Sequence, residues 1–155
     1  MKKSVLVIIM VIYVASIMFI GFFGMEIALF DEKLYVEEII ITNETCEQYS
    51  VYYSQEEGIT YITLFYDDSY EGDWKSGLNP NAIILGYRVV PEDATNRNVM
   101  FSYDQNYEDG INPYGDVTQN GIVRFKRWGS ITVTISALDG SSAKARVTVV
   151  ARKLR

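Results

Sequence analysis

The 155-residue sequence predicts an all-β protein, an antiparallel β-sandwich preceded by one N-terminal transmembrane helix. Three observations lead to this expectation. The first 25 residues are apolar and almost free of charge. Much of the remaining chain alternates polar and apolar residues with a period of two, as strands with one buried face do. Asn-Gly and Asp-Gly dipeptides, which favour tight hairpin turns, separate the last alternating segments.

The N-terminal segment has the length and composition of a membrane span. Residues 4–25 contain no charge, and about 20 apolar residues suffice to cross a bilayer as a helix. This run is longer than the apolar region of a cleavable signal peptide, which has about 7–15 residues, and Phe22 and Phe23 stand near its end. We expect an uncleaved signal-anchor over residues 1–25, with a cleaved signal peptide as the alternative.

Flanking charges predict the orientation of this span. Lys2 and Lys3 precede it, and the acidic residues Glu26, Asp31 and Glu32 follow it. Basic flanks of a membrane helix stay in the cytoplasm. We therefore expect residues 26–155 to lie outside the cytoplasmic membrane as the C-terminal domain of a single-pass protein.

The composition excludes some kinds of site. Cys46 is the only cysteine and histidine is absent, so an internal disulfide and zinc sites of the Cys/His kind are impossible. The net charge of −6 is unevenly distributed: residues 26–116 carry 19 acidic against four basic residues (−15), and residues 117–155 carry eight basic residues against one acid (+7). Such halves attract one another within one fold or present two differently charged surfaces.

The first part of the chain after the span predicts strands and one long loop. Residues 33–43 are rich in β-branched side chains, and residues 48–53 and 58–66 alternate with period two. The stretch DDSYEGDWKSGLNPNA at 67–82 is rich in turn-forming residues and predicts a surface loop. Strand patterns follow at 83–90 and 98–103, and a second loop is expected at 104–115.

The last forty residues predict two hairpins, with turns at Asn120-Gly121 and Asp139-Gly140. Every second residue in 131–137 and 143–150 is apolar and is expected to face inward. The residues expected on the opposite face are Thr132, Thr134, Ser136, Lys144, Arg146 and Thr148. No segment after residue 25 sustains a helical period, so about seven to nine short strands are expected.

Several of these turns occur together in a known order. YRVVPEDATNRNVMFS runs a strand into a Pro-x-x-Ala-Thr-Asn turn and an aromatic-Ser pair, and VTQNGIV is a Val-x-x-x-Gly-x-Val hairpin. With the Asp-Gly turn before the last strand, this pattern resembles the group-2 bacterial immunoglobulin-like domain over about residues 82–150. Residues 35–42 resemble the first strand of that family, whereas residues 43–81 depart from its pattern and leave the strand order there open.

The resemblance implies an immunoglobulin-like β-sandwich over residues 26–155 and a non-catalytic role. Such modules are similar to binding, adhesion or spacer domains of bacterial surface proteins. We expect a protein held in the bacterial cell membrane through residues 4–25, with an envelope polymer or surface protein as partner and no nucleic acid or cofactor. The alternatives are an exported carbohydrate- or calcium-binding accessory domain and a carboxylate-based hydrolase. The oligomeric state is left open.

Three patterns of chemical interest have simpler explanations. Ser141 to Lys144 matches the Ser-x-x-Lys pattern of penicillin-recognising enzymes, but that chemistry needs a helix, and here a turn leads into a strand. Two acidic loops offer oxygen ligands for calcium, although neither has the order of a known cage, and a solvated loop is the alternative. Their residues are Asp67, Asp68, Glu71 and Asp73, then Asp104, Asn106, Glu108 and Asp109. The many tyrosines, Tyr52 and Tyr61 among them, can stack on sugars or anchor a protein partner where they are exposed, but most are expected in the core or at its rim.

The candidate contact surface consists of Trp74, Thr132, Thr134, Lys144 and Arg146. Trp74 stands in the middle of the first loop, where it either meets a ligand or packs the loop against its own domain. The two cations would bind phosphate-bearing polymers, lipid headgroups or acidic proteins in a salt-dependent way. The alternative is that they protect an edge hairpin from pairing with other sheets.

Overall fold

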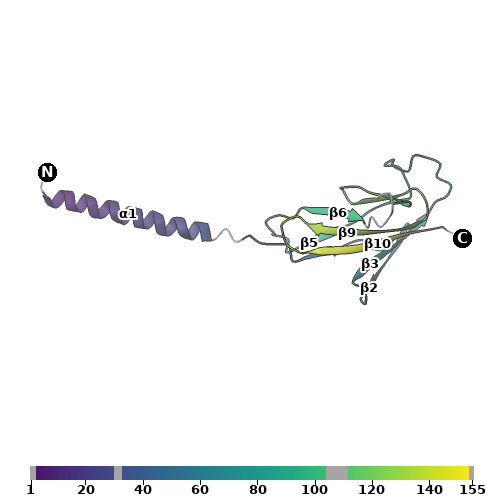
Figure 1. Ribbon diagram of the computed structural model, residues 1–155, viewed down its shortest axis with the longest axis horizontal. Helices are drawn as coiled ribbons and strands as arrows, with labels where there is room; N and C mark the ends of the chain where they lie inside the picture. Colours follow the sequence, from purple (N-terminus) through teal and green to yellow (C-terminus); the bar gives the residue numbers. More distant parts are fainter. Residues whose placement is uncertain (1–2, 30–32, 104–111, 154–155) are drawn as a thin grey trace. The chain divides into compact units, whose positions relative to one another are not determined.

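The computed structural model describes residues 3–29, 33–103 and 112–153 (Figure 1). The chain divides into two units, Met1–Lys33 and Leu34–Arg155. The first unit contains one helix, and the second is built from strands. The predictions of an apolar N-terminal helix and of a mostly β domain after it are therefore confirmed.

The helix α1 runs from Lys3 to Leu29. Its segment Lys3–Gly21 has a mean hydropathy of 2.7 and is long and apolar enough to cross a membrane. The side chains of residues 4–21 are exposed all around the helix, and a helix that is apolar on every face requires an apolar environment. A membrane anchor and a signal sequence share these properties.

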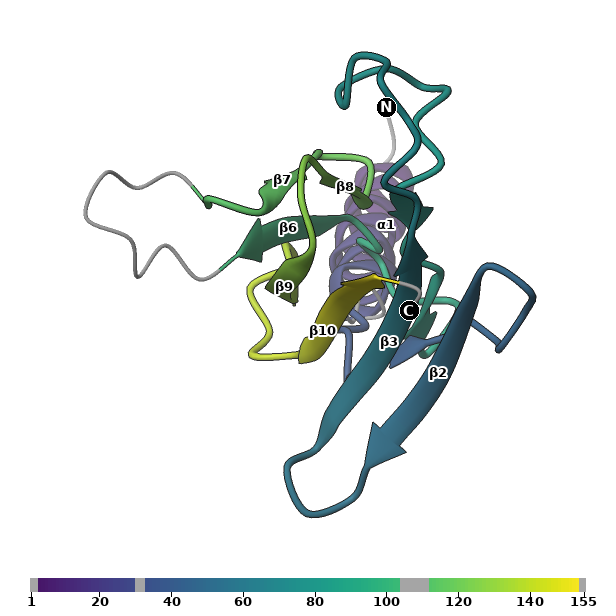
Figure 2. The same ribbon diagram turned by 90° about the vertical axis from the view of Figure 1, so that its right-hand side faces the viewer.

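The second unit contains ten strands and no helix within its described residues. The strands are β1 Glu38–Ile41, β2 Tyr49–Ser54, β3 Ile59–Tyr66, β4 Ala82–Ile84, β5 Tyr87–Val90, β6 Val99–Tyr103, β7 Gly115–Val117, β8 Ile122–Phe125, β9 Gly129–Ala137 and β10 Lys144–Lys153. A five-stranded sheet has the order β2-β3-β10-β9-β6, a three-stranded sheet the order β4-β8-β7, and β1 pairs with β5. Figure 2 shows the β2–β3 hairpin projecting beyond the neighbouring strands.

Strand pairing is antiparallel except between β3 and β10, which are parallel. Buried side chains of all three sheets form one hydrophobic cluster. In β9 and β10 the predicted alternation is confirmed, because Ile131, Val133, Ile135, Val147 and Val149 are fully buried. The five-stranded sheet therefore has one face in the core and one face in solvent.

The two smaller sheets are linked where β4 ends and β5 begins. The side chain of Asn43 donates to the Ile84 carbonyl over 3.0 Å and accepts from the Gly86 N–H over 2.7 Å. Leu85 N–H donates to the Gly121 carbonyl, which extends the β4–β8 ladder by one residue. Asn43, two residues after β1, thus satisfies backbone groups at the break between β4 and β5.

The predicted hairpin of the last two strands is confirmed, since β9 and β10 pair antiparallel, but the alternative that this hairpin lies at the edge of its sheet is wrong. β9 pairs with β6 on its free side, and β10 pairs with β3 from Val147 to Lys153. The edges of this sheet are β2 and β6. The physical reason is the β2–β3 hairpin, which lies in the stretch that departs from the family pattern and covers the last strand.

The burial of β3 predicts unequal effects of two neighbouring substitutions. Leu64 is fully buried, whereas Phe65 points to the solvent face with 41% of its surface exposed. Leu64→Ala should lower the free energy of unfolding by about 2–5 kcal/mol, because it removes core contacts and leaves a cavity. Phe65→Ala should cost less than about 1 kcal/mol. Urea unfolding followed by tryptophan fluorescence measures both, and equal losses would contradict the assigned faces of β3.

Candidate functional site

Four of the five predicted contact residues lie together on the solvent face of the five-stranded sheet. Lys144 lies opposite Ser136, and Arg146 lies opposite Thr134. Thr132 lies opposite Thr148, with 3.0 Å between the two hydroxyl oxygens. Lys144 and Arg146 are exposed, and the two threonines are half-buried. The predicted outward direction of these side chains is confirmed, and their role as a contact surface stays a prediction.

The parallel pairing of β3 with β10 adds residues that the sequence did not assign to this surface. Tyr61 lies beside Thr148, and Phe65 lies beside Arg152. Tyr52 lies beside Tyr61 on the neighbouring strand. The period-two pattern of β3 shows which residues face solvent, but no local signal shows that β3 pairs with a strand more than 80 residues away.

We call this surface the outer face. By strand register it comprises Ser50, Tyr52, Ser54, Ile59, Tyr61, Thr63, Phe65, Met100, Ser102, Ser130, Thr132, Thr134, Ser136, Lys144, Arg146, Thr148, Val150 and Arg152. These strand positions include three cations and no carboxylate. Glu57, in the β2–β3 turn, accepts a short hydrogen bond from the Tyr61 hydroxyl. That bond is the main reason why the pKa of Tyr61 is raised.

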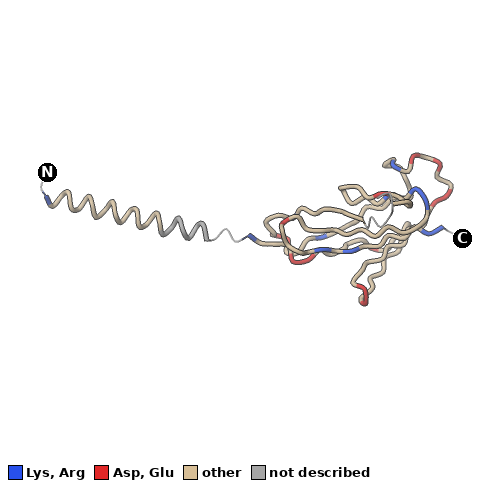
Figure 3. Tube along the Cα trace, viewed as in Figure 1, with Lys and Arg blue, Asp and Glu red and all other residues tan. Residues whose placement is uncertain are grey.

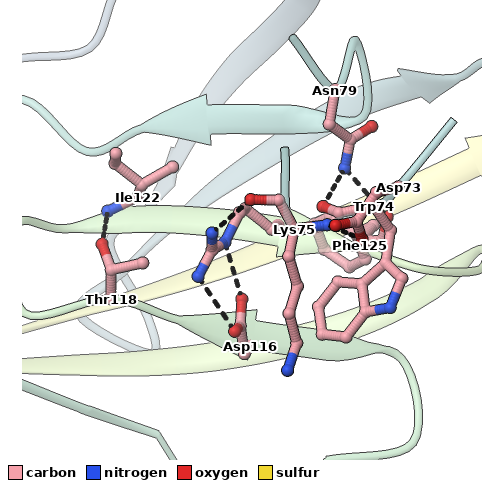
Figure 4. Close-up of polar contacts among 9 residues, drawn as sticks. Asp73, Trp74, Lys75, Asn79, Asp116, Thr118, Ile122 and Phe125 are labelled. Carbon is pink, nitrogen blue, oxygen red and sulfur yellow. Dashed lines mark hydrogen bonds and ion pairs between the residues drawn. The ribbon is translucent and has the colours of Figure 1, made fainter. Parts of the chain in front are cut away.

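Trp74 lies elsewhere, in the loop 67–81 that joins β3 to β4. Its ring is half-buried, with Lys75 Nζ 5.1 Å and Lys126 Nζ 5.9 Å from the ring centroid. Both distances allow a cation–π attraction. Trp74 therefore packs against a lysine that follows β8 in its own domain, and Figure 4 shows its ring beside the side chain of Lys75.

Two buried asparagines close this loop. The Asn81 side chain accepts from the Asp67 N–H over 2.7 Å and donates to the Asp67 carbonyl over 3.0 Å. The Asn79 side chain donates to the carbonyls of Trp74 and Phe125 over 2.8 and 3.3 Å. These bonds satisfy backbone groups that no strand pairs, so they fix the path of the loop (Figure 4).

Arg124 of β8 provides a further attachment. Its Nε and Nη2 donate to the two carboxylate oxygens of Asp116 over 3.0 and 3.1 Å, and its Nη1 donates to the Lys75 carbonyl over 2.7 Å. A planar guanidinium that binds a carboxylate through two parallel bonds has a fixed direction. Arg124 thus joins β7, β8 and the loop that carries Trp74.

The loop and the predicted cations lie at opposite ends of β10. The loop begins after β3, where Asp68 forms an ion pair with Lys153 at the end of β10. Lys144 is the first residue of that ten-residue strand. At about 3.3 Å per residue the two ends are about 30 Å apart. The structure therefore does not bring Trp74 together with the other four predicted residues.

The acidic residues of the loop make local contacts. Asp67 accepts from the N–H and hydroxyl of Ser69, and these bonds lower its pKa. Asp73 accepts from the Lys75 N–H over 3.0 Å. Within the described residues, no group of three or more Asp, Glu, Cys or His side chains is arranged to hold a metal. The second acidic set, Asp104, Asn106, Glu108 and Asp109, falls outside the described residues. Figure 3 shows the acids gathered in the first loop and in the β2–β3 turn.

Ser141 and Lys144 do not form a nucleophile and base arrangement on a helix. Ser141 lies in the turn between β9 and β10, where its N–H donates to Asp139 and its hydroxyl accepts from the Ala143 N–H. Lys144 begins β10 and points to the outer face. Cys46 is an exposed thiol.

No protein-family model matches the chain, and no curated protein matches its sequence. The resemblance to the bacterial immunoglobulin-like family therefore depends on the sequence motifs of its strands and turns.

The closure of the loop leads to a stability prediction. Asn81→Ala should lower the free energy of unfolding by about 1–3 kcal/mol, because the N–H and carbonyl of Asp67 lose their partner. Asn98→Ala, an exposed asparagine after the Pro91 turn, serves as the matched control and should have an effect within about 0.5 kcal/mol. Chemical unfolding measures both variants, and a neutral Asn81→Ala would contradict the structural role of this side chain.

Asp139 predicts a pH dependence. Its carboxylate accepts from the Val36 and Ser141 N–H groups, and the bond from Val36 is the largest cause of its lowered pKa. A lowered folded-state pKa gives stability that is present above the ordinary value near 3.9 and is lost as pH falls below it. Asp139→Asn should therefore be less stable than wild type at neutral pH, with a difference that shrinks below about pH 4. Urea unfolding of both proteins at neutral pH and below about pH 4 measures the difference in their free energies of unfolding. A difference that is the same at the two pH values would refute the prediction.

Proposed function

We propose that this chain is a membrane-anchored, outward-facing immunoglobulin-like module that acts as a non-catalytic binding or spacer domain. The observation that carries the proposal is the strand order, taken together with the apolar helix that precedes it. Each supports a different part: the strand order supports the module type, and the helix supports attachment to a membrane.

The order of strands in the two layers supports an immunoglobulin-like assignment. In that fold the strands A-B-E-D form one sheet and C-F-G the other. If β4 and β5 together count as the B strand, the layer β1-β5/β4-β8-β7 has the order A-B-E-D. The strands β6-β9-β10 then have the order C-F-G. The turns that carry the family resemblance connect strands that this correspondence assigns.

The β2–β3 hairpin is the main addition to that scheme. It occupies part of residues 43–81, which depart from the family pattern, and it extends the second layer beyond β10. An added hairpin enlarges the solvent face of that layer without changing the order of the other strands. A module that acts through a surface gains contact area in this way.

The helix α1 supports anchoring, and its flanks support an orientation with the domain outside. Lys2 and Lys3 precede the apolar segment, and basic residues favour the cytoplasmic side of a span. The length of the apolar run favours an uncleaved anchor over a cleaved signal. The proposal therefore assigns the domain to the outer side of a bacterial cell membrane.

Protease accessibility tests the orientation. In intact protoplasts, an added protease should remove an epitope fused after Arg155, because the domain lies outside the membrane. A cytoplasmic marker should survive, and an external marker should be digested, in the same sample. An epitope that survives beside a digested external marker would reverse the orientation. The mass of the purified chain then distinguishes an anchor from a cleaved signal, since cleavage removes the helix.

A further inference from the structure

We propose that the outer face is a binding surface for an anionic polysaccharide, in which arginine and lysine meet the acidic groups while tyrosines and hydroxyl groups contact the sugar rings. This inference rests on the proposed function, because it gives the binding module a site and a class of ligand.

The first support is the placement of charge in the sheet. Charges that prevent association of sheets belong on edge strands. The edge strands here, YSVYYS in β2 and VMFSY in β6, have no charged residue. The cations of the outer face instead lie on the central strand β10. Arg152 is paired with β3, on the far side of β10 from β9, so edge protection does not explain it; Lys144 and Arg146 precede the ladder with β3 and pair with β9 alone.

The second support is that these cations have no acidic partner within the described residues. The other described cations after residue 117 are engaged: Arg124 with Asp116, Lys153 with Asp68, Lys126 over the Trp74 ring and Arg127 over the Tyr114 ring. No described ion pair or cation–π contact involves Lys144, Arg146 or Arg152. Glu57 lines the same hollow as Lys144 and Arg146 but accepts from the Tyr61 hydroxyl. Three cations without an ion pair thus stand beside one hydrogen-bonded carboxylate, and this excess of positive charge is complementary to an anionic ligand.

The third support is a row of side chains across four strands. The register places Tyr52, Tyr61, Thr148 and Thr132 side by side. Neighbouring strands are about 4.8 Å apart, so the row is about 14 Å long. Tyr52 has 68% of its surface exposed, which leaves its ring free for stacking. Tyrosine combines an apolar ring with a polar hydroxyl, and sugars present the same combination of surfaces.

The row lies between two of the cations along β10. Arg146 precedes Thr148 by two residues, and Arg152 follows it by four, beside Phe65. An acidic sugar on the tyrosine row would have a guanidinium within reach on either side. A guanidinium binds a carboxylate or a phosphate through two parallel bonds, so it orients the acidic group as well as attracting it. Glu57 at the end of this surface is engaged by the Tyr61 hydroxyl.

Binding measurements on the full chain in nanodiscs of zwitterionic lipid test the proposal, with polygalacturonate as the probe. Arg146→Glu should weaken binding roughly tenfold at low salt, and Arg88→Glu, an exposed arginine on β5 of the other layer, should change it less than about twofold. Tyr52→Thr should weaken binding roughly fivefold. Tyr53→Thr, its exposed neighbour on the opposite side of β2, should have little effect.

Three further probes separate the ligand classes. A neutral galactan lacks the charge, poly-glutamate lacks the sugar, and vesicles with anionic lipid present charge on a membrane surface. The proposal expects much weaker binding to all three. Equal binding to poly-glutamate or to anionic vesicles would overturn it, as would absence of polygalacturonate binding. Equal effects of the two arginine variants, or of the two tyrosine variants, would also overturn it. Because these measurements do not depend on where the domain is located, their failure is distinguishable from failure of the protease test.

Discussion

The pairing of β10 on both of its edges is the constraint on which the rest of the domain depends. β10 forms a parallel ladder with β3 over seven residue pairs and an antiparallel ladder with β9 over eight. A two-stranded hairpin alone is at best marginally stable in water, so β2 and β3 need this attachment to a larger sheet. The same two ladders fix which residues of β10 enter the core, because a shift by one residue would exchange its two faces.

The two smaller sheets depend on polar side chains where strand pairing stops. Asn43 binds backbone groups at the break between β4 and β5, and Asn81 binds both backbone groups of Asp67 where β3 ends. An asparagine amide has one acceptor and one donor group, as a peptide unit has, so it can replace a strand neighbour. Through these two residues the backbone groups of Ile84, Gly86 and Asp67 keep hydrogen-bond partners where strand pairing stops.

The sequence predicted the local parts of this structure well. The alternation in β9 and β10 identified their buried residues, and the Asn120-Gly121 and Asp139-Gly140 turns occur as expected. Both glycines have positive φ, 74° at Gly121 and 91° at Gly140, which other residues rarely adopt. The same alternation, which extends over the adjacent strands β9 and β10, predicted that four of the candidate contact residues share one face of the sheet. A strand pattern carries no information on a distant partner, so the neighbours Tyr61 and Phe65 and the central position of β10 could not be predicted.

The central position of β10 also changes how its charges are interpreted. On an edge hairpin, Lys144 and Arg146 would prevent sheets from joining, and no ligand would be needed to account for them. In the structure, Lys144 and Arg146 pair with β9 and precede the ladder with β3, which begins at Val147. Arg152, in contrast, lies opposite Phe65 within that ladder and protects no edge there. The basic C-terminal part of the sequence partly neutralises the acidic part, through Lys153 with Asp68 and Arg124 with Asp116. Lys126 and Arg127 lie over the rings of Trp74 and Tyr114, so among the described cations of this part of the chain only Lys144, Arg146 and Arg152 have neither an ion pair nor a ring contact.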